Sequence, residues 1–372
     1  MRVGIDARMF GPRVGGGGLG RYVEQLVNHL EDADRKTQYV LWLLNANLEA
    51  PRVSEDRFEK RLADIRWYTL REQLFLAPRL DAAHCDLLHF PHWNVPLGIR
   101  TPFVVTIHDL ILLDEPRSAR ATTRAPLVYG AKYAAYKVVL AHAIRASRGI
   151  IAVSEYAKRS ILSHFPDVSP EKISVVYEGV TDLPPTHYPL PPSAPYILHV
   201  GNSYPHKNLE MLLKAFVMVH KEHPDVTLVL AGAQDAFSRR LEREAEALGI
   251  RDAVRFVANP DDETVSALYR DARAYAFPSR AEGFGLPGLE AMSAGVPVAA
   301  AQAGSLPEVY GDAALYFPPH DAAGMAEAMG TLLTDEPIRR QLRERGRERA
   351  RRYSWRRMAE ETRRVYERAM KA

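Results

Sequence analysis

The sequence predicts an α/β protein built from two doubly wound domains, each a parallel sheet with helices on both faces. Short apolar, β-branched runs alternate with segments of helical periodicity along the chain, a pattern that favours parallel sheets covered by helices. The 372 residues exceed the length of one ordinary domain. Six prolines fall within the fourteen residues from Asp182 to Pro195, a density that excludes a helix or a central strand and indicates a linker.

The first half of the chain contains six candidate strands and a clear helical segment. Val23, Leu26, Val27 and Leu30 recur with the spacing of one helix face. The candidate strands are Arg2–Ala7, Tyr39–Leu44, Leu87–Phe90, Phe103–Ile107, Gly149–Val153 and Ile173–Tyr177.

The second half repeats this arrangement. Leu209, Leu212, Leu213 and Phe216 share one helix face. The candidate strands are Tyr196–Val200, Thr227–Ala231, Val254–Val257, Ala274–Phe277, Pro297–Ala300 and Leu315–Phe317. We therefore expect a first Rossmann-like domain over residues 1–183, a proline-rich linker over 184–193 and a second Rossmann-like domain over 194–352. Residues 353–372 should form a C-terminal helix, with packing back on the first domain as one option.

Composition narrows the class of protein. A strand is predicted at once after the N-terminus, which indicates no secretory signal, and no apolar run approaches the ~20 residues that span a bilayer. The single cysteine, Cys85, excludes an internal disulfide and is typical of a reducing compartment. We therefore expect a cytoplasmic protein.

Positive charge is concentrated in two stretches. Residues 339–372 contain 14 Lys or Arg and 5 Asp or Glu, and Arg117 to Arg148 hold seven Lys or Arg and no acid. One interpretation is solvated helix faces. The other is a surface for anionic lipid head groups, which would place the protein on the inner face of the cell membrane. A nucleic-acid binder is disfavoured, because the basic tail has few interleaved aromatic residues and carries helical acids.

The segment from Ser279 to Glu290 is the most informative stretch. It places Glu282 and Glu290 on either side of a glycine-rich turn that follows the strand Ala274–Phe277 and enters a helix, with Glu290 expected in the first helical turn. Backbone N–H groups at such a turn bind an anion. Carboxylates accept hydrogen bonds from sugar hydroxyls. The pattern therefore predicts a ligand with phosphates at one end and hydroxyls at the other.

The glycine run Gly15-Gly16-Gly17-Gly18-Leu19-Gly20 formally matches a dinucleotide-binding fingerprint. A loop from Ala7 to Gly20 would be too long for the tight turn of that fingerprint, and Asn45 follows the second strand where a ribose-binding acid is needed. A nicotinamide-dependent oxidoreductase is thus a weak alternative. We interpret the run as a lip at which backbone approaches a ligand.

Two further strand ends carry polar residues. His108 and Asp109 end the apolar strand Phe103–Ile107, where they could form an acid/base or an orienting pair. The turn from Gly201 to Asn208 precedes a helix for which Asn208 is a candidate N-cap, and a bound phosphate would explain Lys207 beside that helix start. The spacing of His, Cys, Asp and Glu indicates no metal site.

Taken together, these segments resemble the family 4 glycosyltransferases over essentially the whole chain. The strongest match is the pair of glutamates Glu282 and Glu290, with seven residues between them. The other segments that carry the resemblance are the glycine run with Arg21-Tyr22, His108-Asp109, Val153-Ser154-Glu155-Tyr156-Ala157-Lys158, Tyr177-Glu178-Gly179-Val180, Pro205-His206-Lys207-Asn208 and Ser305-Leu306-Pro307-Glu308-Val309. The resemblance implies a GT-B fold, in which two doubly wound Rossmann-like domains face each other across a cleft, the first acceptor-side and the second binding a nucleotide sugar.

The resemblance also implies roles for particular residues. His108, Lys207 and Glu282 would be catalytic, with His108 beside the donor sugar, Lys207 on the leaving phosphate and Glu282 on sugar hydroxyls. Glu290 would hold the ribose. The implied donor-binding residues are Gly18, Asn202, Ser203, Lys207, Arg280, Glu282, Gly283, Phe284, Gly285, Leu286 and Glu290, with Arg280 a candidate for an arginine that many relatives carry near the lysine.

The activity implied is retaining transfer of a hexose, with mannose from GDP-mannose as the best choice, to a glycan or lipid-linked acceptor. No cofactor or metal is expected. The segment His89-Phe90-Pro91-His92-Trp93-Asn94-Val95-Pro96 is similar to bacterial mannosyltransferases. A UDP-sugar-dependent glycosyltransferase and a sugar-nucleotide epimerase of the same fold remain alternatives.

Overall fold

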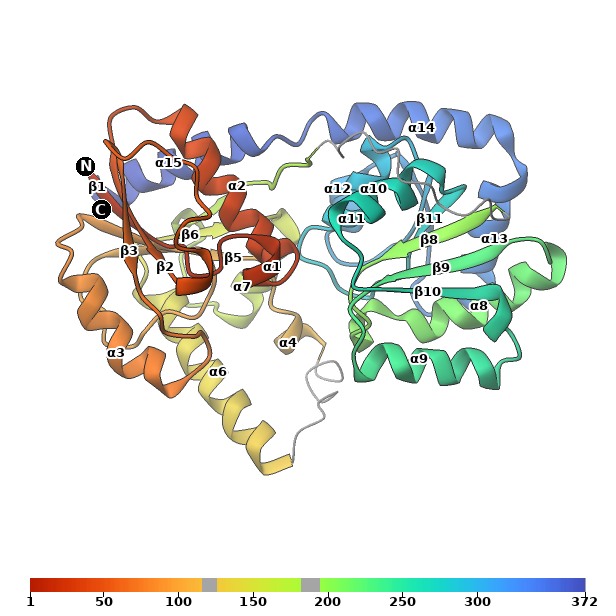
Figure 1. The fold of residues 1–372 in the computed structure, drawn as a ribbon, viewed down its shortest axis with the longest axis horizontal. Coiled ribbons are helices and arrows are strands. Elements are labelled where there is room, and N and C mark those ends of the chain that lie inside the picture. The colour runs from red at the N-terminus through yellow and green to blue at the C-terminus, as the bar shows by residue number, and fades with distance from the viewer. Residues whose placement is uncertain (116–125, 182–194, 372) are drawn as a thin grey trace. The chain divides into compact units, whose positions relative to one another are not determined.

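The computed structural model describes residues 1–115, 126–181 and 195–371, which form two compact units. Unit 1 comprises Met1–Leu110, Arg124–Gly179 and Ser354–Ala372, and unit 2 comprises Ile111–Thr123 and Val180–Tyr353. Each unit is a twisted sheet with helices on its faces (Figure 1). The predicted linker 184–193 lies outside the described residues.

The sheet of unit 1 has seven strands in the order β3-β2-β1-β4-β5-β6-β7, and its strand pairs are parallel. The strands are β1 (Arg2–Asp6), β2 (Gln38–Leu43), β3 (Phe58–Leu62), β4 (Leu87–Phe90), β5 (Phe103–Ile107), β6 (Gly149–Ala152) and β7 (Ile173–Val175). The central strands β4, β5 and β6 are buried throughout. Their continuous apolar sequences fit strands that are covered on both faces.

Helices connect these strands and cover the sheet. They are α1 (Pro12–Gly15), α2 (Gly18–Ala33), α3 (Leu70–Asp81), α6 (Pro126–Ala146), α7 (Glu155–His164) and α15 (Trp355–Lys371), with 3-10 turns at Asn45–Asn47 and Pro170–Lys172. The face of α2 that carries Val23, Leu26, Val27 and Leu30 is fully buried. The 3.6-residue period therefore identified the buried face of this helix correctly.

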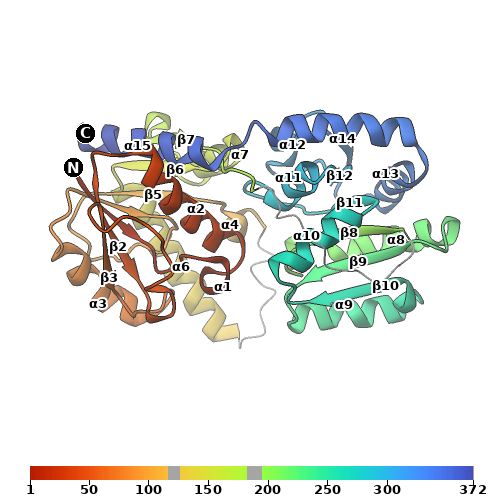
Figure 2. The same ribbon diagram turned by 45° about the horizontal axis from the view of Figure 1, so that its top comes forward.

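The C-terminal helix α15 belongs to unit 1, although the chain reaches it through unit 2. It lies along α2 and contacts β4, β5 and β6, and Figures 1 and 2 both show it beside α2. Its apolar face, which includes Trp355, Met358, Val365 and Tyr366, is buried. Helix α15 therefore covers the sheet of unit 1 together with α2.

The sheet of unit 2 has six strands in the order β10-β9-β8-β11-β12-β13, and its pairs are also parallel. The strands are β8 (Tyr196–Val200), β9 (Thr227–Gly232), β10 (Val254–Ala258), β11 (Ala274–Phe277), β12 (Val298–Ala301) and β13 (Ala314–Phe317). The strand order reverses direction between β8 and β11. Ligands of open α/β sheets bind at such a switch point, outside the carboxyl ends of the strands.

The helices of unit 2 are α4 (Ile111–Asp114), α8 (Leu209–Glu222), α9 (Ala236–Ala247), α10 (Asp262–Asp271), α11 (Leu286–Ser293), α12 (Leu306–Tyr310), α13 (Ala322–Thr334) and α14 (Glu336–Ala350), with 3-10 turns at Pro205–Lys207 and Arg251–Ala253. Leu212, Leu213 and Phe216 of α8 are fully buried. Each crossover returns the chain to the same edge of the sheet, so the loops that follow β8, β9 and β11 gather there.

All twelve predicted strands are present, with ends shifted by up to two residues. The strand that the sequence did not predict is β3, whose residues Phe-Glu-Lys-Arg-Leu carry three charges. It lies at the edge of the sheet and its side chains are mostly accessible. Charged residues are typical of edge strands, which need no apolar run.

The expectation of one long loop from Ala7 to Gly20 was wrong. Pro12–Gly15 form a helical turn, and α2 already begins at Gly18. A Cβ atom at Gly20 would lie 2.3 Å from the Gly11 carbonyl oxygen, and one at Gly15 would lie 2.1 Å from the Met9 carbonyl oxygen. Glycine is needed here because backbone packs on backbone, so these two glycines have a structural role that a repeat pattern cannot reveal.

This packing predicts opposite effects for two glycines of α2. Gly20→Ala forces a methyl group onto the Gly11 carbonyl and should destabilise unit 1 by about 1–3 kcal/mol. Gly18→Ala meets no atom within 4 Å and should be neutral or stabilise by up to ~1 kcal/mol, because alanine favours a helix. Hydrogen exchange of α2 amides in the two variants measures this difference. Equal protection in both would contradict the close approach.

Candidate active site

The central feature of unit 2 is a strand–loop–helix unit at the carboxyl end of β11. The chain leaves β11 at Phe277, passes Ser279 and Glu282 and enters α11 through Gly285, whose φ of 101° lies in the left-handed region that glycine adopts without strain. Glu282 and Glu290 are both buried. Glu290 is the fifth residue of α11 and so lies in the second turn, which corrects its expected place in the first turn. A role in offsetting the helix dipole is correspondingly weaker.

The turn after β11 is held in place by the segment that leads into α12. Ser305 donates its hydroxyl hydrogen to the Phe284 carbonyl at 3.0 Å, and Tyr310 donates to the Gly285 carbonyl at 2.6 Å. A Cβ atom at Gly288 would lie 2.2 Å from the Tyr310 hydroxyl. Because these carbonyls are occupied, the path of the turn is rigidly defined before any ligand arrives.

Glu282 forms an ion pair with Lys207, with 2.6 Å between Oε1 and Nζ. Lys207 ends the 3-10 turn Pro205–Lys207, which follows β8, and the Arg280 amide donates to the His206 carbonyl at 2.8 Å. The loops after β8 and β11 are therefore joined by a backbone hydrogen bond and by a charge pair. The structure thus brings together two of the predicted catalytic residues.

Burial and the neighbouring groups together set the pKa values of Glu282 and His206. Burial alone would raise the pKa of Glu282, but the nearby Lys207 and His206, together with Ser279, outweigh it and lower the pKa below its usual value. Burial, reinforced by Lys207, lowers the pKa of His206 to about 4. At neutral pH Glu282 is therefore an ionised carboxylate, and His206 is a neutral imidazole.

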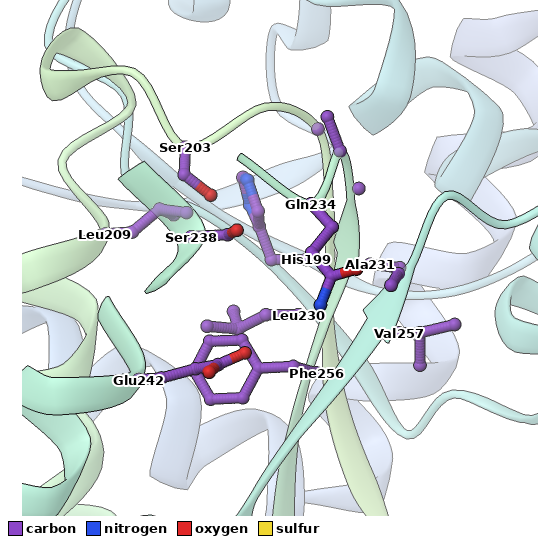
Figure 3. A pocket seen from close by; sticks show the side chains of 14 residues that line it. His199, Ser203, Leu209, Leu230, Ala231, Gln234, Ser238, Glu242, Phe256 and Val257 are labelled. Carbon is purple, nitrogen blue, oxygen red and sulfur yellow. The ribbon is translucent and has the colours of Figure 1, made fainter. Parts of the chain in front are cut away.

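Asn202 and Ser203 lie in the loop directly after β8. The Asn202 side chain accepts a hydrogen bond from the Tyr204 amide at 3.3 Å, which shapes the turn. Ser203 lines a pocket with an empty volume of about 450 Å³ at the carboxyl ends of β8, β9 and β10, and its side chain and those of Gln234 and Ser238 are drawn in Figure 3. The pocket therefore lies beside the predicted phosphate site, and both polar and apolar groups line it.

His199 also lines this pocket. Its Nδ1 lies 3.0 Å from the Ala276 carbonyl, which can only accept, so Nδ1 carries the hydrogen. Burial lowers the pKa of His199 to about 4, so the ring is neutral at pH 7 and Nε2 is an acceptor. Within the described part of the chain Nε2 has no hydrogen-bond partner. A hydroxyl or N–H group of a ligand could supply one.

Glu290 is contacted by Tyr269 from α10. The Tyr269 hydroxyl lies 3.3 Å from Glu290 Oε2 and 3.0 Å from the Pro287 carbonyl. Burial, with the charge of Glu290, keeps the pKa of Tyr269 well above its ordinary value, so the phenol remains a donor. Tyr269 therefore orients the carboxylate of Glu290.

The Asn208 side chain does not make the expected N-cap, whereas Arg280 stays a candidate for the predicted phosphate site. Asn208 stands at the N-terminus of α8, but its amide donates to the Pro278 and Pro319 carbonyls at 3.0 and 2.7 Å and makes no cap. It joins the loops after β8, β11 and β13 instead. Arg280 lies 3.6 Å from Glu115 and 3.4 Å from the Asn208 side chain. Arg280 thus carries its charge close to the predicted phosphate site.

In unit 1, His108 stands just beyond the carboxyl end of β5. Its Nδ1 is 2.9 Å from Glu178 Oε1 and its Nε2 is 2.9 Å from the Pro91 carbonyl oxygen. Burial alone would lower the pKa of His108, but Glu178 and the Pro91 carbonyl outweigh it and raise the pKa. Because both partners accept, both ring nitrogens must donate, and His108 is an imidazolium. A general base needs a free nitrogen, so this geometry favours a fixed cation.

A buried hydrogen-bonded network supports His108 from below. The Tyr22 ring meets the His108 ring edge-on at 4.6 Å, and the Tyr22 hydroxyl is 3.0 Å from Thr106. Thr106 in turn lies 2.9 Å from His89, whose other ring nitrogen is 2.7 Å from the Tyr366 hydroxyl on α15. Burial lowers the pKa of His89 to about 3, so this ring is neutral. The C-terminal helix thus takes part in positioning the strand end.

The remaining predicted residue, Gly18, is exposed at the N-terminus of α2 in unit 1. Gly18 and His108 therefore belong to one unit, while the other predicted site residues belong to unit 2. Among the described residues, no group of three or more His, Cys, Asp or Glu side chains is placed to hold a metal ion.

Several residues of the site were not predicted as such. Tyr269 and Tyr310 lie within helices, at positions that resemble ordinary core positions in the sequence. Their contacts with the loop after β11 depend on how the helices pack. Glu178 and Ser305 lie in segments that carry the resemblance to the family 4 glycosyltransferases. This resemblance was the signal that could have identified them as site residues.

Comparison with known proteins agrees with this division into two units. Residues 16–182 match the description Glycosyltransferase Family 4, and residues 186–349 match Glycosyl transferases group 1. A D-inositol 3-phosphate glycosyltransferase of Corynebacterium kroppenstedtii is 32% identical over 329 residues, which cover 80% of this chain and 71% of that protein. The O-antigen chain mannosyltransferase B of Escherichia coli is 37% identical over 43% of this chain and 42% of its own length.

A solved structure shares the fold over almost the whole chain. Sucrose-phosphate synthase from Thermosynechococcus elongatus superimposes with a TM-score of 0.77 at 23% identity, covering 99% of this chain and 98% of that one. The arrangement of two parallel, helix-covered sheets is therefore the GT-B fold that the sequence predicted.

The charge on His108 predicts a pH dependence of local stability. A raised folded pKa means that the stabilisation is fully present below the unfolded value of ~6.5 and is lost as the pH rises through the folded value. Hydrogen exchange of β5 amides should therefore show a protection difference between wild type and His108→Gln that is largest at pH 6 and shrinks at alkaline pH. A difference that is independent of pH would contradict the imidazolium assignment.

Proposed function

The chain belongs to the family 4 glycosyltransferases, and we propose that it moves a hexose from a nucleoside diphosphate sugar to a glycan or lipid-linked acceptor with retention of configuration. The best choice of donor is GDP-mannose, and the product would enter polysaccharide or lipid-linked glycan assembly. The observation that carries the proposal is the ion pair between partly accessible Lys207 and buried Glu282, at the carboxyl edge of a parallel sheet and beside a helix start.

The pair is suited to a ligand that carries both phosphates and hydroxyls. An incoming diphosphate offers Lys207 a stronger anionic partner than one carboxylate. Glu282 would then accept hydrogen bonds from the sugar hydroxyls. Because the pKa of Glu282 is lowered, it is ionised and ready to accept at neutral pH. On donor binding, Lys207 and Glu282 would thus give up their contact with each other. Lys207 would then contact the diphosphate, and Glu282 would contact the sugar.

The surrounding groups complete the donor site in this proposal. Backbone N–H groups from Gly283 to Leu286 would meet the diphosphate at the start of α11, where the helix dipole favours an anion. Glu290 would hold the ribose, since two hydroxyls match one carboxylate. The supporting donor contacts would come from Gly18, Asn202, Ser203 and Arg280.

The reaction itself would depend on stabilising the leaving group. Lys207 and the start of α11 would neutralise the charge that develops on the departing diphosphate, which is usually the largest catalytic effect in such a site. Glu282 and Glu290 both have binding roles, so neither is assigned as a covalent nucleophile. We propose front-face attack, in which the leaving phosphate removes the proton from the acceptor hydroxyl, and no metal ion.

His108 would act beside the donor sugar as a fixed cation, not as a base. Both of its nitrogens already donate to Glu178 and Pro91. Its positive charge would stabilise negative charge that builds up on the donor. The partial match to an O-antigen mannosyltransferase supports mannose, while the match to an inositol phosphate glycosyltransferase leaves other hexoses open. A UDP-sugar donor and an epimerase remain the alternatives.

The donor is tested by thermal shift with GDP-mannose, GDP, UDP-glucose and UDP. We expect GDP-mannose to stabilise unit 2, and Glu290→Ala to weaken this binding by about ten- to a hundredfold through loss of two ribose hydrogen bonds. Glu222→Ala, which removes an exposed acid at the end of α8, is the control and should bind like wild type.

The outcomes separate the alternatives. Stabilisation by UDP-sugars alone would overturn the choice of GDP-mannose and leave the class intact. Isomerised nucleotide sugar without a transfer product would indicate the epimerase. If Glu290→Ala binds the donor as wild type does, the ribose role of Glu290 is wrong.

The membrane contact that the basic stretches suggested is better supported by another surface. In residues 339–371 many arginines are already occupied, for example Arg349 by the Glu308 and Val309 carbonyls and Arg363 by Glu367. Helix α3, in contrast, turns Leu70, Leu74 and Phe75 to solvent, with exposed fractions of 75%, 58% and 54%. No helix in the described part of the chain is long and apolar enough to cross a bilayer.

The charges of α3 match an anionic lipid surface. Arg71 and Arg79 are exposed on the same side as its apolar residues, whereas its two acids are Glu72, which is buried, and Asp81, which accepts hydrogen bonds from Thr101 at the helix end. Apolar and basic side chains on one helix face are typical of a helix that lies in the head-group region. We call Leu70, Arg71, Leu74, Phe75 and Arg79 the α3 surface. We propose that the protein attaches peripherally to the cytoplasmic leaflet through this surface.

Vesicle sedimentation tests the α3 surface. The protein should bind vesicles that contain roughly 30 mol% phosphatidylglycerol, an anionic lipid that attracts basic side chains, and should not bind vesicles of pure phosphatidylcholine. Leu74→Glu with Phe75→Glu should abolish binding, while Arg363→Glu on α15 should not. If the variant binds unchanged, or if it only dissociates a dimer seen by light scattering, the α3 surface is not the membrane contact.

A further inference from the structure

Two aromatic side chains of unit 1 form an exposed stack whose function the donor site does not explain. Tyr68 lies over Trp93, with 5.0 Å between ring centroids and 18° between the ring planes. Tyr68 is 49% exposed and Trp93 is half-buried. Tyr136 of α6 meets the other side of Trp93 edge-on at 4.7 Å. We call Tyr68 and Trp93 with the neighbouring His92 the aromatic platform.

The backbone at Tyr68 is strained. Its φ is 59°, in the left-handed region that a bulky residue rarely adopts. Strain of this kind costs ~1–3 kcal/mol and persists where the surroundings impose it, often at a site that binds a ligand. A glycine would occupy this position more easily, so the tyrosine ring itself needs an explanation.

A buried charged cluster imposes this conformation. Glu72 accepts from the Tyr68 amide at 2.8 Å and from Asn94 at 2.7 Å, so it joins the chain segment before α3 to the loop after β4. Arg8 lies 2.6 Å from Glu72 and 2.7 Å from Asp6, and all three side chains are buried. The cluster therefore holds Tyr68 and Trp93, one on each loop, in contact.

His92 links the platform to His108. Its ring centroid lies 5.0 Å from that of Trp93, 6.0 Å from that of Tyr68 and 6.2 Å from that of His108. Burial and the charge of His108 keep the pKa of His92 well below its ordinary value, so the ring is neutral. Within the described residues its buried Nδ1 has no hydrogen-bond partner. The platform thus ends in an unsatisfied polar atom beside the predicted catalytic residue.

We propose that the aromatic platform is the subsite for a pyranose ring of the acceptor. This inference rests on the proposed glycosyltransferase function. A pyranose has an apolar C–H face and polar edges, and half-exposed aromatic rings offer the matching apolar surface. Strained Tyr68 presents its ring, and the unpartnered Nδ1 of His92 offers a polar group at the edge. The protein would thus recognise a sugar ring of the acceptor and not a lipid chain alone.

The polar groups of the subsite favour a sugar over a purely apolar ligand. The phenol of a half-exposed tyrosine is protonated at neutral pH, so Tyr68 offers a hydrogen-bond donor. The subsite therefore has an aromatic floor, a hydroxyl donor and an imidazole. Apolar pockets with a few polar groups of this kind are typical of small-ligand sites.

Saturation-transfer NMR with methyl α-D-mannopyranoside and methyl β-D-glucopyranoside tests the subsite. At least one probe should receive saturation on its C–H face from the wild-type protein. Tyr68→Gly should reduce the signal about three- to tenfold, as expected for loss of one aromatic contact. Glycine relieves the strain at φ 59° but removes the stack on Trp93, so the thermal unfolding midpoint of the variant is measured alongside, and an unchanged midpoint shows that a loss of signal is not due to unfolding.

Two further variants complete the design. Trp93→Phe keeps a ring and should lose signal to a smaller extent. Phe75→Ala removes an exposed ring of α3 outside the platform and should keep the full signal. Saturation that is absent from wild type at tens of millimolar probe, or that is equal in wild type and Tyr68→Gly, would overturn the proposal.

Nucleotide-sugar binding, measured in the same variants, separates this proposal from the proposed function. Tyr68→Gly should retain the thermal shift with nucleotide sugar. If no nucleotide sugar binds any form of the protein while the pyranosides still depend on Tyr68, the glycosyltransferase function fails and the sugar subsite stands. If the donor binds and the pyranosides do not depend on Tyr68, the subsite alone fails.

Discussion

A charged side chain that leaves water must meet an opposite charge, because an unpaired buried charge costs several kcal/mol. The loops at the carboxyl ends of both sheets are arranged around this constraint. Arg8 pairs with Asp6 and Glu72, His108 with Glu178, and Lys207 with Glu282. Except for Arg8 with its near neighbour Asp6, these pairs connect segments far apart in sequence. The loops that carry the chemistry are therefore held by electrostatics, whereas the sheets below them are held by apolar packing.

The pairs differ in how readily a ligand could replace them. The Arg8 cluster is almost fully buried, and its guanidinium is also occupied by the Ile65 carbonyl. It is a permanent support. Lys207 and Glu282 retain about a tenth of their exposed surface, so a phosphate can reach the ammonium group. The His108 side chain is 16% exposed, but Glu178 and the Pro91 carbonyl occupy both of its ring nitrogens. Accessibility thus separates the Arg8 cluster from the other two pairs.

Local sequence predicted the fold well because parallel strands need continuous apolar runs and helices need a 3.6-residue period. It failed where a different rule applied. Edge strand β3 has no apolar run, and the glycines at 15 and 20 serve close backbone packing, not a loop. The predicted site residues Lys207 and Glu282 meet, but their contact, and the clamps from Ser305 and Tyr310, required the third dimension.

By itself, the sequence determined the two α/β domains, the family and the residues Glu282, Glu290, Lys207 and His108 as candidates, because these depend on periodicity and on short local patterns. Only the tertiary structure decided that His108 is held as a cation by Glu178 and Pro91, that α15 completes unit 1, and that Tyr68 stacks on Trp93. The physical reason is that protonation and stacking depend on partners dozens or hundreds of residues away. Folding brings these partners within a few ångströms, and no local pattern records them.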